Sequence, residues 1–424
     1  MRLRNHHRAI IPCIFILLMS MQVLAGDKLT LTTGSEEAKQ AFLEGVRLLE
    51  NQQFQHVLPE AEKAIEADSN FAMAIMLKSS FIQQNDQRTP MLEKALTKKM
   101  SDGERKYIHA MLVLRQGDNQ GSLDEFTALR KAYPGDRMVQ MMYAQLHMIL
   151  GNLDEALAGF KDAEKIDNTT TRAKTLIGNC AILTGKYDKA RQIYKEVISL
   201  SDPDASPFFP FFGMAWADIY EGKHANALKI YDEYLDRYNR NGAAQGFPPV
   251  WIWNQIARVN LELGDANEAL RCYDIGYKSV PPTPDAQVDS TQKLVWLGRM
   301  KHGKARTLAK LGRFEEADAI VADVKKMIDE GGKEAEQYIP AYHYLAGYVE
   351  LERQNWPAAV EHLEKADATN TFHVYLLAKA YYKNGQIDKA REKFQAVVDS
   401  KTNNVERALS YPEAVKMLAK LGTN

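Results

Sequence analysis

The sequence has few cysteines, little net charge and only one long apolar run, and each scarcity excludes a class of protein. Three cysteines in 424 residues cannot form the dense disulfide framework of a small secreted scaffold. The 54 basic and 55 acidic side chains leave a net charge of −1, which argues against strong nonspecific binding to nucleic acid or to an anionic membrane. With 45% hydrophobic and 26% charged residues, the composition is that of a folded protein. At this length we expect either two or three domains or one repeated architecture.

The one long apolar run lies at the N-terminus and has the form of a secretory signal. Three arginines within the first eight residues precede the almost wholly apolar stretch 10–19, and the small residue Ala25 follows where signal peptidase cleaves. The stretch is shorter than the roughly 20 residues of a membrane-spanning helix, so we expect cleavage after Ala25 rather than an anchor. Residues 1–25 are thus predicted to be a signal peptide and residues 26–35 an N-terminal linker, in a product that is periplasmic or secreted.

The mature chain has no further segment that approaches 18 consecutive apolar residues, so we expect no membrane insertion after cleavage. Two cysteines, Cys180 and Cys272, remain in it. They could pair only if the fold brought their Cα atoms within about 7 Å. We expect two buried thiols instead, because free cysteine behaves as a small apolar core residue.

The dominant pattern is an internal repeat built on a glycine. An alanine stands five residues after each glycine, and an alanine or a glycine stands seven residues before it. Nine residues after the glycine, the residue is aromatic in five of the six copies. The glycines of these copies are Gly151, Gly185, Gly222, Gly264, Gly312 and Gly385.

The recurring glycine, small and aromatic positions of this repeat predict a helical hairpin. A glycine ends one helix at a tight turn where positive φ is cheap, and the small residues on either side let two antiparallel helices approach closely. The aromatic residue is expected to fill the space between one hairpin and the next. The 34-residue spacing of Gly117, Gly151 and Gly185 accommodates two helices of about 13 residues and two turns. The pattern resembles the tetratricopeptide repeat, whose period is 34 residues.

This resemblance implies an all-α fold, a right-handed α-solenoid of about nine or ten antiparallel helix hairpins. The repeat array is expected over residues 36–400, with residues 401–424 as a C-terminal capping helix. Two degenerate units have Gln52 and Gln354 where the others have glycine, and residues 71–97 are expected to form a hairpin without it.

After Gly185 the repeat spacing lengthens, and the surplus residues are rich in proline, glycine and polar side chains. We therefore expect loops there. Such loops could contact a partner, or they could simply be insertions that the surface tolerates. The expected loops are residues 201–210, 240–249, 279–289 and 329–337.

The sequence contains none of the motifs that usually mark catalysis. We find no His-Glu-x-x-His, no Gly-x-Ser-x-Gly, no Cys-x-x-Cys and no calcium-loop pattern, and we expect neither enzymatic activity nor a cofactor or metal. Residues 298–304 match most of a phosphate-binding loop, but Ala305 replaces its final Ser or Thr. The motif is expected to lie inside a helix, where its amides are unavailable to phosphate.

In tetratricopeptide arrays the first helix of each hairpin lines the concave face, so the resemblance implies which positions face a ligand. In this chain they form an aromatic patch beside a cationic stripe in the C-terminal half. Aromatic residues at helical spacing are also typical of packing, and a basic run is typical of a solvated face, so both readings stay open. The candidate residues are Phe209, Phe212, Trp216, Tyr220, Trp251, Arg258, Arg299, His302, Arg306, Lys310, Tyr344, Tyr348, Tyr375 and Lys379.

We interpret the chain as an exported, non-catalytic scaffold of the cell envelope that binds a protein or peptide segment in the concave groove. Aromatic residues and arginine anchor interfaces, so the expected partner segment is acidic and aromatic-bearing. An accessory subunit of an envelope enzyme is a subtype of this hypothesis. The alternative is a binding module for a small anionic ligand or a glycan, with the aromatic patch as a stacking platform. The carboxylate clamp of some family members is not expected, because Thr175 and Gly213 occupy two of its positions.

Overall fold

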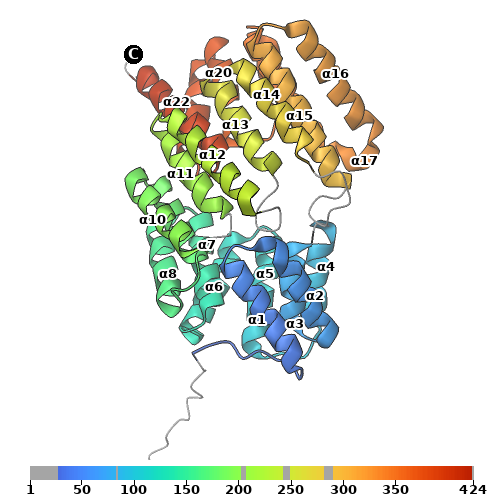
Figure 1. Cartoon of the computed structure of the whole chain (residues 1–424), viewed down its shortest axis with the longest axis vertical. Helices are drawn as coiled ribbons and strands as arrows, with labels where there is room; N and C mark the ends of the chain where they lie inside the picture. The colour runs from blue at the N-terminus through green and yellow to red at the C-terminus, as the bar shows by residue number, and fades with distance from the viewer. Residues whose placement is uncertain (1–26, 83–84, 202–206, 242–248, 281–289, 423–424) are drawn as a thin grey trace, which may run out of the picture.

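The computed structural model describes residues 27–82, 85–201, 207–241, 249–280 and 290–422, and these residues form helices without a strand. Consecutive helices pack against each other in pairs, so the predicted α-solenoid is confirmed. In Figure 1, helices α1 to α10 form one half of the molecule and α11 to α22 the other. The expected signal peptide, residues 1–25, lies outside the described residues.

Ten helix pairs account for most of the described chain, close to the expected number. The pairs are α1 (Glu36–Glu50) with α2 (Val57–Ala67), α3 (Ala72–Phe81) with α4 (Asn85–Leu96), α5 (Asp102–Arg115) with α6 (Asn119–Ala132), α7 (Arg137–Ile149) with α8 (Leu153–Ile166), α9 (Arg172–Leu183) with α10 (Tyr187–Leu200), α11 (Phe208–Tyr220) with α12 (His224–Asn241), α13 (Pro249–Leu263) with α14 (Ala266–Lys278), α15 (Ser290–Lys310) with α16 (Phe314–Glu330), α18 (Ile339–Glu352) with α19 (Trp356–Leu363), and α20 (Thr371–Lys383) with α21 (Ile387–Asp399). The remaining elements are η1 (Phe54–His56), α17 (Gly332–Ala335), η3 (Glu336–Tyr338) and α22 (Val405–Gly422).

The turns inside the hairpins explain why glycine recurs at one position of the repeat. Gly117 and five of the six repeat glycines have positive φ, between 71° and 91°, and Gly264 is the exception. Only two described residues other than glycine have positive φ, namely Gln52 at 62° and Gln354 at 66°. These are the two positions at which the sequence pattern places a glutamine in the glycine column. The degenerate hairpins therefore use the same turn as the regular ones, with a less suitable residue.

The small residues and the aromatic residue of the repeat contact each other, as the pattern predicts. A Cβ atom at Gly178 would lie 2.6 Å from the ring of Tyr194, and one at Gly213 would lie closer still to the same ring. Tyr194 is fully buried and stands between its own hairpin and the next. The small residues therefore let the helices close around an aromatic core.

Two further expectations are confirmed. Cys180 and Cys272 are free and buried, so they pack as thiols rather than pairing. Residues 298–305 lie inside α15, and Ala305 is fully buried, so the backbone amides of the partial phosphate-loop motif belong to a helix.

The described part of the expected N-terminal linker, residues 27–35, packs across the array, and we call it the strap. The amide of Leu29 donates to Asp136 Oδ2 at 3.0 Å, and that of Thr32 donates to Glu104 Oε1 at 2.8 Å. Asp136 and Glu104 already cap the N-termini of α7 and α5 through other hydrogen bonds. Because both carboxylates are buried, the strap satisfies acceptors that would otherwise lack partners.

The expected loops differ from the structure at two places. Helix α11 begins at Phe208, so residues 208–210 are helical; Pro210 fits there because the first turn of a helix needs no donated hydrogen bond from its amides. Residues 329–337 contain the end of α16, then α17 and the start of η3, rather than an open loop. Most of the expected loops 240–249 and 279–289 lies outside the described residues.

Candidate functional site on the inner face of the C-terminal half

The first helices of neighbouring hairpins form an inner row. In the C-terminal half, α13 contacts α15, α15 contacts α18, and α18 contacts α20. Helix α22 packs on α21, and it also contacts α11, α13 and α20 (Figure 1). The C-terminal helix therefore returns to the beginning of this half and closes the inner row on itself.

An ion pair marks the place where α22 enters the inner row. Arg258 of α13 pairs with Glu406 in the first turn of α22, and the guanidinium lies 5.1 Å from the centre of the Phe372 ring. Arg258 is only 8% exposed. Burial raises the pKa of the Glu406 carboxyl, but the charge and hydrogen bond of Arg258 outweigh it, so the pKa is lowered overall. Glu406 is therefore an ionised carboxylate bound by an enclosed arginine.

A second buried arginine lies beside this pair. Arg306 of α15 is 4% exposed and donates from Nη2 to the hydroxyl of Tyr273 at 3.0 Å. Its Nη1 atom lies 3.6 Å from Glu262 Oε1, an ion-pair distance that is too long for a hydrogen bond. Glu262 also accepts from the hydroxyl of Tyr348 at 3.2 Å. The guanidinium faces the rings of Tyr344 and Tyr348 at 5.5 and 5.6 Å, a cation–π arrangement.

The rings of two histidines lie nearly parallel to the ring of Tyr344. The ring centres of Tyr344 and His373 are 3.9 Å apart, and those of Tyr344 and His302 are 6.3 Å apart. The surrounding protein withdraws both imidazoles from water and the nearby arginines repel further positive charge, so the pKa falls to about 3 for His302 and about 4 for His373. Both rings are neutral at pH 7. We call Arg258, His302, Arg306, Tyr344, His373 and Glu406 the inner cluster.

At the margin of this cluster one cation is exposed. The guanidinium of Arg299 lies 4.6 Å from the Trp296 ring and 5.6 Å from the Trp251 ring. Arg299 is exposed and Trp251 is half-buried, while Trp296 is buried. No ion pair of Arg299 occurs among the described residues. An aromatic surface and an accessible cation therefore stand next to each other.

Further along the inner row are two lysines. Lys310 is exposed, with Nζ 3.5 Å from Glu352 Oε1. Lys379 is half-buried, and its Nζ lies 5.6 Å from the centre of the Tyr375 ring. Burial lowers the pKa of Lys379. The cationic stripe expected from the sequence thus lies on the inner row, but much of it is enclosed by protein rather than solvated.

The aromatic patch of α11 is mainly packing. Phe212 and Tyr220 are buried, and the Tyr220 hydroxyl accepts from Arg407 Nη1 at 2.9 Å. The Tyr411 ring packs edge-on against Tyr220, with centres 5.7 Å apart. Phe209 and Trp216 are half-buried. For this helix the packing reading is the one that the contacts favour, because α22 occupies its inner side.

The structure therefore divides the candidate residues into three groups, and their role in binding stays a prediction. Six are buried: Phe212, Tyr220, Arg258, Arg306, Tyr344 and Tyr348. Six are half-buried: Phe209, Trp216, Trp251, His302, Tyr375 and Lys379. Arg299 and Lys310 are exposed.

Several neighbours of these residues were not among the candidates. Trp296 precedes Arg299 by three residues on the same helix, a spacing that places both on one face. That spacing was available in the sequence. His373, Glu262 and Glu406 carried no such signal, because their proximity to the arginines depends on how the array curves.

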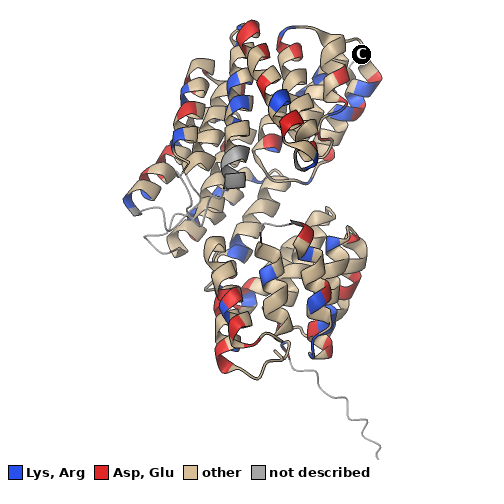
Figure 2. Cartoon of the chain, turned by 90° about the vertical axis from the view of Figure 1, so that its right-hand side faces the viewer, with Lys and Arg blue, Asp and Glu red and all other residues tan. Residues whose placement is uncertain are grey.

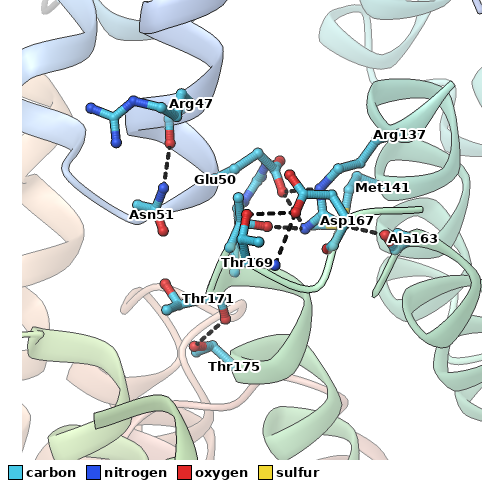
Figure 3. Close-up of polar contacts among 12 residues, drawn as sticks. Arg47, Glu50, Asn51, Arg137, Met141, Ala163, Asp167, Thr169, Thr171 and Thr175 are labelled. Atoms are coloured by element: carbon cyan, nitrogen blue, oxygen red, sulfur yellow. Dashed lines mark hydrogen bonds and ion pairs between the residues drawn. The ribbon is translucent and has the colours of Figure 1, made fainter. Parts of the chain in front are cut away.

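The N-terminal half is closed by a separate buried cluster (Figure 3). Glu50, at the end of α1, is 4% exposed and lies 2.8 Å from Arg137 Nη2 and 3.1 Å from Arg172 Nη1. Arg137 also donates to the carbonyl oxygen of Asp167 at 2.9 Å. Figure 3 shows Glu50 facing Arg137 beside the segment around Thr169. None of the side-chain polar atoms of Glu50, Arg137 and Arg172 is buried without a hydrogen-bond partner, so the C-terminal half is the better candidate for an external ligand.

The part of the chain that the structure describes contains neither a cluster of metal ligands nor a membrane-spanning helix. No group of three or more His, Cys, Asp or Glu side chains is placed to hold a metal ion in this part of the chain. No helix among the residues that the structure describes is long and apolar enough to cross a membrane. Charged residues of both signs are distributed over the visible helices (Figure 2).

Solved structures with related folds include a tetratricopeptide repeat protein from Parabacteroides merdae ATCC 43184, which is 12% identical. The match covers 62% of this chain and 99% of that one, with a TM-score of 0.38. PilW, a type IV pilus biogenesis factor, is 15% identical over 57% of this chain and 99% of its own, with a TM-score of 0.40. YrrB, a tetratricopeptide repeat protein with an unusual peptide-binding site, is 20% identical over 39% of this chain and 87% of its own, with a TM-score of 0.25.

Sequence comparisons identify the repeat itself. Among curated proteins the chain has no significant match. Three family models, each described as tetratricopeptide repeat, match residues 109–169, 171–204 and 374–400. These segments fall on helices α5 to α10 and on α20 and α21. The chain therefore contains tetratricopeptide repeats within an all-helical α-solenoid.

Proposed function

We propose that this protein is an exported, non-catalytic scaffold that binds an acidic, aromatic-bearing segment of a partner protein at the inner row of its C-terminal half. Tetratricopeptide repeat proteins are generally protein-interaction scaffolds. The acidic and aromatic character of the proposed partner rests on the surplus of cations over carboxylates around the inner cluster. One of these cations, Arg299, is exposed beside two tryptophan rings.

Counting the charges supports an acidic partner. Arg258 has Glu406, and Arg306 shares Glu262 with a tyrosine hydroxyl, whereas Arg299 is left over. Burial is the main cause of the low pKa values of His302 and His373, and the charge of Arg306 lowers both of them further. A carboxylate on the partner would be attracted by this positive charge, and electrostatic attraction of this kind raises both association rate and specificity.

The same place supports an aromatic contact. Trp251 and Trp296 have ring centres 5.2 Å apart in an edge-to-face arrangement, with the Arg299 guanidinium over both rings. Tryptophan and arginine are the side chains most often found at the energetic centre of interfaces. An aromatic residue that follows an acidic one in the partner segment could pack on this surface while its carboxylate meets Arg299.

Export is supported by the N-terminal pattern of arginines, apolar residues and a small residue before Gly26. We therefore place the scaffold in the periplasm or outside the cell.

Charge reversal tests the proposal. We expect the double variant R299E/K310E to lose partners that the native chain captures on chemical cross-linking in intact cells. The matched control is K165E/R271E, which reverses two exposed charges on the second helices of other hairpins. Both variants change the net charge equally, so a specific loss in the first variant supports the inner row. Equal partner sets for native chain and both variants would contradict it.

A further inference from the structure

Three nitrogen atoms in the inner cluster are buried without a hydrogen-bond partner. They are Nε of Arg258, Nη1 of Arg306 and Nδ1 of His373. Buried polar groups normally have partners, because a desolvated N–H without one costs about 1–3 kcal/mol, and more when it is charged. Arg258 and Arg306 are each more than nine-tenths buried, so bulk water cannot serve as the partner.

The three atoms lie in the same part of the structure. Arg306 lies over the ring of Tyr344, and His373 stacks on that same ring. Arg258 lies over the ring of Phe372, the residue next to His373 in the chain. The charges of Arg258 and Arg306 both act on the His373 imidazole, so these three groups, on helices α13, α15 and α20, lie near one another.

The chemistry of the three groups selects an acceptor with negative charge. Arginine nitrogens can only donate, and a neutral imidazole can donate from Nδ1 when its other nitrogen is unprotonated. The cluster already binds one carboxylate, that of Glu406, through Arg258. The contact between Arg258 and the Glu406 carboxylate therefore shows that this part of the structure accommodates an oxyanion.

We propose that the inner cluster is a binding site for a small oxyanion, a carboxylate or a phosphate group, held between Arg258, Arg306 and His373. The anion takes hydrogen bonds from the three nitrogens, which have no other hydrogen-bond partner among the described residues. It lies beside Glu406, which competes with it for Arg258. This site goes beyond the proposed scaffold function, because it requires no protein partner and uses the enclosed arginines rather than exposed Arg299.

The experiment measures binding of two defined probes, inorganic phosphate and glutarate, to the full-length mature chain. Melting temperature and calorimetric affinity are recorded at constant ionic strength, with sodium chloride as the reference. We expect at least one probe to raise the melting temperature saturably, since a ligand that binds only the folded state stabilises it by mass action. Saturation by phosphate alone identifies a phosphate site, by glutarate alone a carboxylate site, and by both a general oxyanion site.

Variants localise the effect. H373F keeps the ring that stacks on Tyr344 but removes its nitrogens, and it should weaken binding about tenfold, the value of one hydrogen bond to a charged group. E406Q removes the competing charge and should tighten binding severalfold. H343F is the control, because His343 pairs with His362 elsewhere, with Nδ1 atoms 3.0 Å apart.

Two results would overturn the proposal. One is the absence of a saturable effect of either probe on the native chain beyond that of chloride. The other is equal probe affinity in H373F, E406Q and H343F, which would place any bound anion elsewhere. R306M is a further variant, but Arg306 also bonds Tyr273, so its loss of stability must be separated from its loss of binding.

Discussion

Arg258 on α13 and Glu406 on α22 form an ion pair although 148 residues separate them in the chain. In the N-terminal half, Glu50 at the end of α1 pairs with Arg172 on α9, 122 residues later. Each half of the solenoid is thus closed by one carboxylate from a terminal helix that meets an arginine on an inner helix. Contacts in a solenoid otherwise run mainly between neighbouring repeats, so these pairs couple repeats that would be independent.

Removing the carboxylate of Glu50 should destabilise the N-terminal half strongly. Glu50 is enclosed between Arg137 and Arg172, and a buried pair that loses one member leaves an uncompensated charge, which costs about 3–5 kcal/mol. We expect E50A to lower the free energy of unfolding by that amount in guanidinium titrations. The control is E44A, which breaks the exposed pair with Arg47 and should cost less than about 1 kcal/mol. Equal losses in the two variants would contradict the claim that Glu50 closes the N-terminal half.

Replacing Gln354 by glycine should stabilise the protein. Gln354 is exposed and has a φ of 66°, a conformation that costs a residue with a Cβ atom about 1–2 kcal/mol. We expect Q354G to recover about 1 kcal/mol, after allowance for the greater flexibility of glycine in the unfolded chain. The reverse change, G385Q at a turn with φ of 76° and open space around it, should destabilise. Thermal unfolding of both variants checks the pair, and a destabilised Q354G would show that the turn is not strained.

Acidification should destabilise the C-terminal half through His302 and His373. In the folded chain their pKa values are about 3 and about 4, against about 6.5 unfolded, so the unfolded state binds more protons as the pH falls below 6.5. Stability that is present above pH 6.5 is therefore lost progressively, down to about pH 4 for His373 and about pH 3 for His302. Arg258 and Arg306 oppose protonation of His373, whereas Asp367 and Glu406 favour it.

The measurement is the free energy of unfolding against pH for the native chain and for H302F/H373F. At about 1.4 kcal/mol for each unit of pKa shift, the maximum contribution is roughly 5 kcal/mol for His302 and roughly 3 kcal/mol for His373. The double variant should therefore show a flatter profile between pH 6.5 and 4. A profile as steep as that of the native chain would mean that these rings do not remain neutral in the folded state.

Export predicts a defined N-terminus. If signal peptidase removes residues 1–25, the chain isolated from its native compartment begins at Gly26, directly before the strap that binds Asp136 and Glu104. Intact-mass spectrometry of protein from a fractionated cell would measure this. Recovery of the chain from the cytoplasm with Met1 or Arg2 at its N-terminus would reject the export assignment.

The sequence predicted the repeat well because local physics determines it. A turn that needs positive φ selects glycine, and two helices that approach closely around Tyr194 select small residues at fixed distances from it. These constraints act within a few dozen residues. They allowed even the irregular turns at Gln52 and Gln354 to be recognised from their register alone.

The candidate site was predicted less completely, for a physical reason. The inner row of a solenoid follows from register, so Arg258, Arg306 and Tyr344 could be placed on one face. How far that face closes depends on small rotations that accumulate from repeat to repeat, and no local pattern encodes their sum. Burial of Arg306 and pairing of Arg258 with Glu406 therefore appeared only in the folded chain.

Site-specific photo-cross-linking tests the central claim most directly. A photoreactive residue placed at position 299 or 310 lies on the exposed part of the inner row, and one placed at the exposed position Lys326 of α16 serves as the control. We predict that irradiation of living cells links the same partner to positions 299 and 310 and not to 326, and that the linked peptide is acidic and contains an aromatic residue. Cross-linking at 326 with none at 299 or 310 would contradict the assignment of the inner row as the binding surface.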